Sequence, residues 1–468
     1  MSPLAAEAPS VAVVGGGLAG LAAGCALAGA GFRVTLLERR PYLGGRASSY
    51  EHPGTGEVVD NCQHVLLGCC TNLADFYRRI GVAEKIRWFD RLTFVEPGGR
   101  QSVISPSWLP APFHSAPSFL RADSLSFADK VAIARAMLAI TARLPEETEE
   151  NFLAWLRRHG QTERAIERFW KVVLVSALNE DLDRMSVHYA AQVFRESFLK
   201  SPEAGRMGIP AVPLTELYSA GADYIRARGG EVALRAAVES FQPEPGAVRL
   251  CLAGREVRAD FAVLAVPFDA LTRLLPQAAD TQPLRQQLAR FETSPITGIH
   301  LWFDRQITEL EHAVLLDRTI QWMFHKSKLL GARAAEQNSG SYVELVVSSS
   351  KALVEKPKNE IEEMALRELH EFFPGAAEAK LLKSTVIKEI NATYSALPRS
   401  DDYRPGASTA WPSVFLAGDW TATGWPATME GAVRSGYQAA EALARSAGRE
   451  GRFLLPDLAA TGFMRLFG

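Results

Sequence analysis

Residues 11–46 restrict the fold of this chain more than any other stretch of it. The apolar run VAVV leads into a glycine turn of the form G-x-G-x-x-G, made by Gly15, Gly17 and Gly20. A run of small residues that is typical of a helix follows, and then a second apolar run, VTLLE. Strand, glycine turn, helix and strand in this order predict a βαβ unit whose turn holds a dinucleotide.

Each residue type in this unit suits that ligand. Gly15 allows the sharp turn after the strand, Gly17 leaves room for a pyrophosphate, and Gly20 lets helix and strand pack closely. Free N–H groups and the positive end of the helix dipole attract the pyrophosphate. Glu38 ends the second strand, where a carboxylate accepts hydrogen bonds from an adenosine ribose. A glycine turn that binds no ligand would not require a strand before it, a helix after it and an acidic residue at the end of the second strand.

The same stretch has a second interpretation, because residues 11–32 carry no charge and could span a membrane. Seven glycines fall in these residues, however, and no basic residue precedes them in MSPLAAEAPS. Neither a transmembrane helix nor a signal peptide fits this pattern. We therefore expect a nucleotide-binding unit.

A cluster of arginines and glycines follows in E-R-R-P-Y-L-G-G-R. Arg39, Arg40 and Arg46 bring three cations near the pyrophosphate, and guanidinium groups suit phosphate geometry. A solvated charge cluster would not need the paired glycines that end at Gly45. The string resembles the motif after the Rossmann unit of flavin amine oxidases, protoporphyrinogen oxidases and carotenoid desaturases, and the resemblance implies FAD rather than a nicotinamide.

A second signature lies near the C-terminus, in VFLAGDWTATGWPATMEGAVRSGYQAAEAL. Asp419 follows Gly418 at the end of a predicted strand and can bind ribityl or phosphate oxygens. The helix N-terminus at Met429 offers N–H groups to the flavin N1–C2=O edge and stabilises the anionic reduced ring. The string is similar to G-D-x-T…M-E-G-A-x-x-S-G of carotenoid desaturases. In relatives of this class a strand contacts the adenine through its backbone, and the resemblance puts that contact at Val238.

Composition restricts the class of protein. At 468 residues the chain is long enough for a large core and two structural domains. A net charge of −2 argues against a nucleic-acid partner. The five cysteines form no C-x-x-C pair and lack histidine partners, so we expect a reducing cytoplasm and no metal site.

The fold class that we expect is α/β, similar to amine oxidases and phytoene desaturases. A Rossmann-like FAD-binding domain is interrupted twice by a substrate domain, first helical and then rich in sheet. The boundaries that we expect for the FAD-binding domain are residues 1–98, 205–290 and 385–446. Those of the substrate domain are 99–204 and 291–384, and residues 447–468 form a C-terminal tail.

The stretch DNCQHVLLGCCTNLADFYRRIGV resembles the D-x-G-x-H-h-h-h-G segment of plant-type carotenoid desaturases. It is more similar to the squalene-associated FAD-dependent desaturases of bacterial hopanoid clusters, the hydroxysqualene dehydroxylase family. Asn61 and Cys62 depart from the desaturase pattern, which argues against simple carotenoid desaturation. The resemblance covers nearly the full length. It implies reductive removal of the allylic hydroxyl of hydroxysqualene, giving squalene and water as FADH2 becomes FAD.

This reaction needs an acid that protonates the leaving hydroxyl and a dry pocket that protects an allylic cation. Asp60 and His64 are the candidates for that acid, although either could instead hold the flavin or be hydrogen-bonded in the core.

Three other functions stay open at this point. A carotenoid-type desaturase would use oxidised FAD. An amine oxidase usually has a lysine near flavin N5, and none can be assigned from the sequence. A non-catalytic isoprenoid carrier would resemble the Rab escort proteins, which lack a complete flavin site.

Apolar residues also gather in two segments without helical or strand periodicity. One is residues 105–121, with Trp108 and Phe113, and the other is the C-terminal FLLPDLAATGFMRLFG. They either pack on the protein or touch a bilayer. We therefore expect a cytoplasmic protein with peripheral contact to the inner membrane face, an apolar triterpene substrate and an electron donor that the sequence does not identify.

Overall fold

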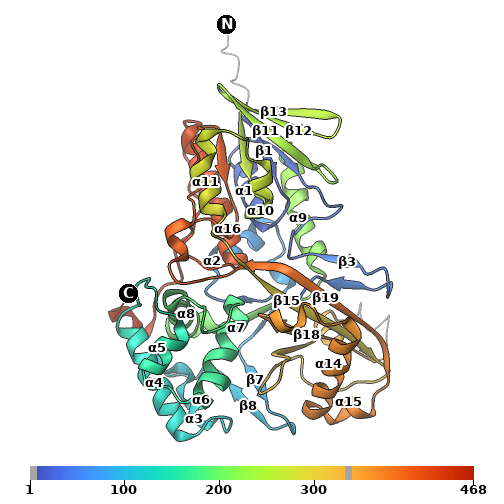
Figure 1. The fold of residues 1–468 in the computed structure, drawn as a ribbon, viewed down its shortest axis with the longest axis vertical. Helices are drawn as coiled ribbons and strands as arrows, with labels where there is room; N and C mark the ends of the chain where they lie inside the picture. The colour runs from blue at the N-terminus through green and yellow to red at the C-terminus, as the bar shows by residue number, and fades with distance from the viewer. Residues whose placement is uncertain (1–7, 332–339, 468) are drawn as a thin grey trace.

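The computed structural model describes residues 8–331 and 340–467. The start of MSPLAAEAPS, on which the argument against a signal peptide depends, lies outside this range. Figure 1 shows a nucleotide-binding region above, a helical block at the lower left and a large sheet at the lower right. None of the helices in the described ranges combines the length and the apolar character that crossing a bilayer requires.

The nucleotide-binding region is built on a parallel five-stranded sheet of order β10-β2-β1-β14-β20. Its strands come from distant parts of the chain: β1 (Ser10–Val14), β2 (Arg33–Leu37), β10 (Glu231–Ala233), β14 (Phe261–Leu264) and β20 (Val414–Leu416). The chain therefore completes this sheet only after it has entered and left the substrate region twice.

Both faces of the sheet are covered, which explains why β1 and β2 read as almost continuous apolar runs. Val11 and Val13 face a helical layer, whereas Ala12 and Val14 face an antiparallel three-stranded sheet. The helical layer consists of α1 (Leu18–Gly29), α2 (Thr71–Arg79), α9 (Leu214–Arg226) and α16 (Met429–Ser446). The antiparallel sheet consists of β11 (Val238–Glu244), β12 (Ala247–Leu252) and β13 (Arg255–Ala259), and α10 (Phe268–Leu274) and α11 (Gln282–Leu288) pack nearby.

The substrate region contains a seven-stranded sheet of order β19-β15-β18-β17-β16-β7-β8. Its strands are β7 (Leu92–Val95), β8 (Gln101–Ile104), β15 (Thr293–Phe303), β16 (His312–Leu315), β17 (Trp322–His325), β18 (Ser341–Ser348) and β19 (Leu381–Tyr394). The helices α14 (Lys358–Phe372) and α15 (Pro374–Glu378) cover one face (Figure 1). Short elements join the two regions: β3 (Ser49–Glu51), β4 (Val58–Asp60), β5 (Leu66–Leu67), β6 (Ile86–Phe89), β9 (Met207–Pro210) and α12 (Lys326–Leu329).

Residues 126–200 form helices as their periodicity predicts: α4 (Phe127–Ala142), α5 (Phe152–Arg158), α6 (Glu163–Ala165), α7 (Val172–Leu178) and α8 (Val187–Phe194). The block also contains α3 (Ala116–Arg121), a short helix in the segment 105–121, where we expected no helix. Ser126 caps α4, and it exchanges hydrogen bonds with Asp129 in a capping box.

Two of the expected domain boundaries pass through single elements. The hairpin of β7 and β8 pairs with β16 in the substrate sheet, so the boundary after residue 98 falls in its turn. The strand β19 pairs with β15 over its length, so the boundary at residue 385 divides one strand. These two long strands connect the substrate sheet with the nucleotide-binding region (Figure 1), which the composition of the segments did not indicate.

Candidate flavin and substrate cavity

A cavity of about 710 Å³ lies where the nucleotide-binding region meets the substrate region. Of the residues predicted to hold the cofactor, all but Gly20 line it: Gly15, Gly17, Glu38, Arg39, Arg40, Gly45, Arg46, Val238, Gly418, Asp419 and Met429. His64 also lines the cavity, whereas Asp60 does not. The structure thus brings the two sequence signatures together around one space.

The glycine turn has the shape that a dinucleotide requires. Gly15 has a φ of +107°, and a Cβ on Gly20 would lie 1.9 Å from the Gly15 carbonyl oxygen. Gly20 therefore acts by packing, as predicted. A Cβ on Gly45 would lie 3.0 Å from the Cα of Gly17, and the Gly44 N–H donates to Gly16 O at 2.9 Å. The paired glycines of LGGR thus dock backbone to backbone on the glycine turn, which keeps both loops free of side chains at the cavity.

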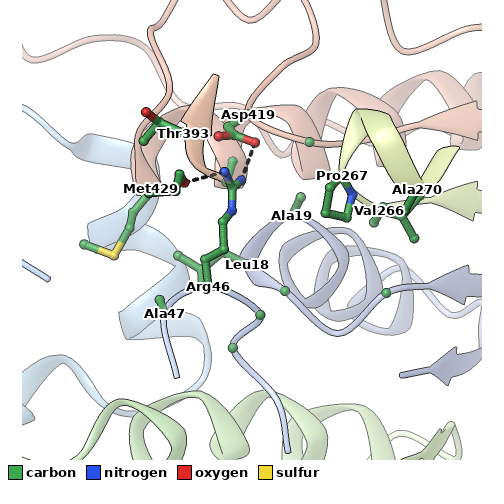
Figure 2. Close-up of a pocket in the computed structure, with 18 of the residues that line it drawn as sticks. Leu18, Ala19, Arg46, Ala47, Val266, Pro267, Ala270, Thr393, Asp419 and Met429 are labelled. Carbon is green, nitrogen blue, oxygen red and sulfur yellow. Dashed lines mark hydrogen bonds and ion pairs between the residues drawn. The ribbon is translucent and has the colours of Figure 1, made fainter. Parts of the chain in front are cut away.

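The first turn of α1 supplies the donors for a pyrophosphate. Gly17 is the N-cap of α1 and has no side chain to occupy the N–H groups of that turn. Leu18 and Ala19, which follow it, line the cavity (Figure 2). A helix N-terminus with exposed N–H groups is a ready site for an anion.

Glu38 is held at the end of β2. Its carboxylate accepts hydrogen bonds from the N–H groups of Gly16 at 2.6 Å and Arg40 at 2.7 Å. Its backbone oxygen accepts from Ala236 N–H at 2.8 Å, which brings the start of β11 with Val238 to the same part of the cavity. Each carboxylate oxygen keeps a lone pair for a ribose hydroxyl, so these residues fit the adenosine end of FAD.

The arginines differ from the predicted cluster of three cations on a phosphate. Arg46 pairs with Asp419 (Nη2 to Oδ1, 2.6 Å) and donates to Ala392 O at 2.7 Å (Figure 2). Arg40 donates to Gly45 O at 2.9 Å, and Arg39 is exposed at the rim of the cavity. Because Arg46 and Asp419 balance each other's charge, they present one polar pair rather than a cation and a separate acceptor.

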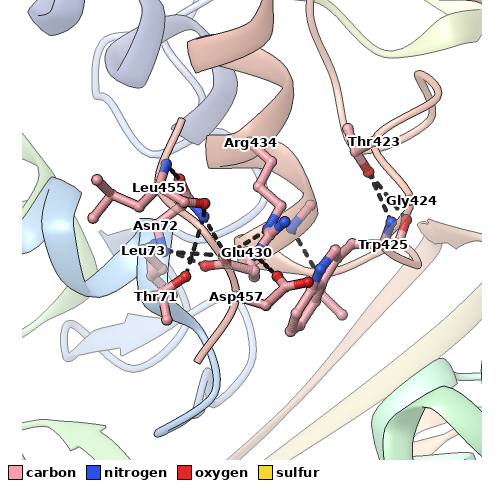
Figure 3. Close-up of polar contacts among 12 residues, drawn as sticks. Thr71, Asn72, Leu73, Thr423, Gly424, Trp425, Glu430, Arg434, Leu455 and Asp457 are labelled. Carbon is pink, nitrogen blue, oxygen red and sulfur yellow. Dashed lines mark hydrogen bonds and ion pairs between the residues drawn. The ribbon is translucent and has the colours of Figure 1, made fainter. Parts of the chain in front are cut away.

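Residues at the start of α16 have two different roles, one at the cavity and one away from it. Met429 lines the cavity, and Thr428 caps the helix by accepting from Gly431 N–H at 3.0 Å. Glu430 points the other way and is fully buried. It accepts hydrogen bonds from Asn72 N–H at 3.1 Å and Leu73 N–H at 2.7 Å, so it caps α2 (Figure 3).

Asp60 is part of a buried ion pair. Its carboxylate contacts Lys326 Nζ at 2.6 Å and accepts from Ser49 Oγ at 2.6 Å and Leu214 N–H at 3.3 Å. Burial alone would raise the pKa of Asp60, but Lys326 and these hydrogen bonds outweigh it and hold the pKa below its ordinary value. A buried carboxylate that stays ionised and lies outside the cavity does not suit the role of proton donor, so we correct that assignment.

Lys326 is the residue that the sequence analysis did not assign. It follows β17, its side chain is 2% exposed, and Nζ also contacts Gln63 Oε1 at 2.7 Å and Glu344 Oε2 at 3.6 Å. It lies behind the cavity wall rather than on it. Burial raises the pKa of Glu344 to about 8, despite the nearby lysine, so Glu344 is mostly protonated at neutral pH. The opposite charges of Asp60 and Lys326 then cancel, so the cluster carries no net charge.

His64 is the predicted candidate that does face the cavity. Its Nδ1 lies 2.7 Å from Cys62 O and must donate there, because a carbonyl oxygen only accepts. The lone pair of the neutral ring is therefore on Nε2. Burial lowers the pKa of His64, so the neutral form predominates at neutral pH.

The far end of the cavity contains residues that no sequence motif indicated. Ala177 and Asn179 come from α7 and its C-terminal cap, Ile296 from β15, and Val65 from the segment after His64. Asn179 donates to Ser294 O and Thr393 Oγ1, each at 2.9 Å, and so ties the helical block to β15 and β19. Isolated side chains from three distant segments carry no periodic signal, which explains why they were missed.

This fold and cavity define a dinucleotide-binding oxidoreductase. The family described as "Flavin containing amine oxidoreductase" matches residues 18–444, and the chain belongs to that family. FAD is its cofactor, and the glycine turns, Glu38 and the N-termini of α1 and α16 fit that group.

Similar proteins extend across the whole chain. The 15-cis-phytoene desaturase of Synechococcus elongatus is 29% identical over 92% of this chain and 95% of its own length. A probable zeta-carotene desaturase of the same organism is 27% identical over 92% and 98%. The solved structure of an oxidoreductase from Methanosarcina mazei has the same fold, with a TM-score of 0.71 and 19% identity over 91% of this chain and 98% of that one.

Proposed function

We propose that this FAD-dependent oxidoreductase removes the allylic hydroxyl of hydroxysqualene reductively and releases squalene and water. The observation that carries the proposal is His64, which lines the cavity and, with Nδ1 held by Cys62 O, keeps its lone pair on Nε2. It belongs to the segment DNCQHVLLG, which resembles hydroxysqualene dehydroxylases. A substrate hydroxyl can form a hydrogen bond with this nitrogen, whereas a hydrocarbon polyene offers no polar group for a hydrogen bond.

In this reaction the C–O bond breaks, the hydroxyl leaves as water with one added proton, and a hydride completes the new C–H bond. Reduced FAD supplies the hydride when bound. His64, once protonated, donates the proton from Nε2 to the leaving oxygen, and its lowered pKa makes it a stronger acid. Val65, Ala177 and Ile296 surround the carbon chain with apolar groups and exclude water from the allylic cation.

Desaturation of an isoprenoid chain by oxidised FAD is the second candidate. Its support is the similarity to phytoene and zeta-carotene desaturases, together with the neutral resting state of His64. In that direction the ring would take up a proton rather than deliver one. The two functions therefore use the same residue with opposite proton transfers.

An anaerobic single-turnover experiment separates them. The flavin is reduced with dithionite and mixed with hydroxysqualene, while absorbance and products are followed. Reoxidation with one squalene per flavin supports the proposal. Absence of reoxidation, with bleaching of the oxidised flavin by a phytoene-like polyene, overturns it in favour of desaturation. His64→Gln tests the acid, since glutamine keeps hydrogen bonding but supplies no proton.

A further inference from the structure

Large apolar side chains are exposed together on the helical block and the end of the chain. We call them the apolar surface: Trp108, Phe113, Leu120, Phe127, Leu138, Phe463, Leu466 and Phe467. Trp108 is 90% exposed, and Phe127 and Leu466 are each 78% exposed. The other large apolar residues that are exposed in the described ranges are aliphatic, so the exposed aromatic ones are all on this surface.

Direct contacts connect the segments that supply it. The rings of Phe113 and Phe463 meet edge to face with centroids 6.2 Å apart, and Phe463 N–H donates to Ala111 O at 2.8 Å. Lys130 Nζ donates to Leu120 O at 2.8 Å, one helical turn from Phe127. The loop before α3 therefore contacts the C-terminal turn, and the end of α3 contacts the start of α4.

The C-terminal segment is held firmly before it reaches this face. Asn72 accepts from Leu455 N–H at 2.8 Å and donates to Leu455 O at 3.2 Å, and Arg434 pairs with Asp457 (Figure 3). Thr461 N–H then donates to Lys200 O at 3.0 Å. Although the segment is tied to the protein, it leaves Phe463, Leu466 and Phe467 exposed to water. This exposure costs free energy unless something covers these side chains.

Basic side chains accompany the apolar ones. Arg121 and Arg465 are exposed beside Leu120 and Leu466, and the ammonium of Lys130 adjoins Leu120. The neighbouring carboxylate of Asp129 is occupied at the N-terminus of α4 and by Thr162. Exposed aromatic and aliphatic groups with adjacent cations match the interface of an anionic bilayer.

We propose that the apolar surface docks on an anionic lipid bilayer, with Trp108, Phe127 and Leu466 entering the headgroup region. A second copy of the chain is a poorer occupant, because a two-fold interface would bring two copies of the same basic groups into one contact. The proposal goes beyond the reaction, since it holds for whichever apolar substrate the cavity accepts.

Vesicle co-sedimentation of the FAD-bound protein tests the proposal. We expect binding to vesicles of phosphatidylcholine with phosphatidylglycerol, and weaker binding to phosphatidylcholine alone. The triple variant Trp108→Ser, Phe127→Ser and Leu466→Ser should bind about a hundredfold more weakly. The matched control Leu234→Ser and Leu382→Ser replaces exposed apolar residues elsewhere and should bind like the wild type.

Two further measurements keep the result decisive. The flavin absorbance spectrum shows whether each variant is folded, and Arg121→Glu with Arg465→Glu tests the cations in a protein that keeps every apolar group. Loss of the phosphatidylglycerol dependence in that variant supports the proposal. Wild-type protein that stays in the supernatant with both vesicles overturns it. So does a triple variant that changes only from dimer to monomer in light scattering.

Discussion

Replacement of Lys326 by methionine tests whether the buried pair with Asp60 organises the cavity wall. Nζ and Oδ2 are 2.6 Å apart, and the two side chains are 2% and 5% exposed. Methionine keeps much of the volume and removes the charge, so Asp60 is left as an unpaired buried carboxylate. Breaking a buried pair in this way costs about 3–5 kcal/mol.

A second argument gives a similar magnitude. Without Lys326, Asp60 can avoid the unpaired charge by taking up a proton. Protonating a carboxyl group of ordinary pKa at pH 7 costs about 4 kcal/mol. We therefore expect Lys326→Met to lower the free energy of unfolding at pH 7 by about 3–4 kcal/mol.

The pH dependence of the variant gives the sharper test. In the wild type the pKa of Asp60 is lowered, so its contribution to stability is present above the unfolded pKa and is lost on acidification. In Lys326→Met burial still opposes ionisation of Asp60, and only the hydrogen bonds from Ser49 and Leu214 remain to favour it, so the pKa of Asp60 rises and the folded state binds more protons. On acidification the variant should therefore lose less stability than the wild type.

The assay is urea unfolding of the protein with saturating FAD, followed by circular dichroism at several pH values. Lys383→Met is the matched control, because Lys383 pairs with Glu57 at a half-exposed site and should cost less than about 1 kcal/mol. Adding Asp60→Asn to Lys326→Met should recover part of the loss. A variant as stable as the wild type, with no change in pH dependence, would refute the reasoning.

Three other predictions follow from the site. Turnover of hydroxysqualene should rise about tenfold per unit as pH falls toward the lowered pKa of His64, in stopped-flow measurements, whereas turnover that does not rise on acidification would exclude His64 as the acid. Wild-type stability should fall as the pH rises from about 5 to 8, because Glu344 stays protonated in the folded protein but ionises in the unfolded chain. Glu344→Gln should remove this loss, which urea titrations across that range measure. Gly20→Ala should destabilise the apoprotein, because its Cβ would lie 1.9 Å from a carbonyl oxygen, while Gly17→Ala should leave the apoprotein stable and weaken FAD binding in fluorescence titration.

Local sequence alone determined the nucleotide-binding unit. A backbone turn with φ near +107°, a helix that packs against a carbonyl oxygen and a loop that approaches a ligand each exclude a side chain, so Gly15, Gly17 and Gly20 are recognisable without any distant contact. The N-cap at Ser126 and the strand that ends at Glu38 are local in the same sense.

Tertiary structure decided which charged residues face the cavity. Asp60 and Lys326 are 266 positions apart, and Arg46 and Asp419 are 373 apart, so neither pairing has a signal in spacing. The pairing turned the predicted acid Asp60 into a buried structural anion and left His64 as the candidate proton donor of that segment on the cavity wall. Burial and partner charge set the pKa of a carboxyl group, and both exist only after distant segments of the chain have packed together.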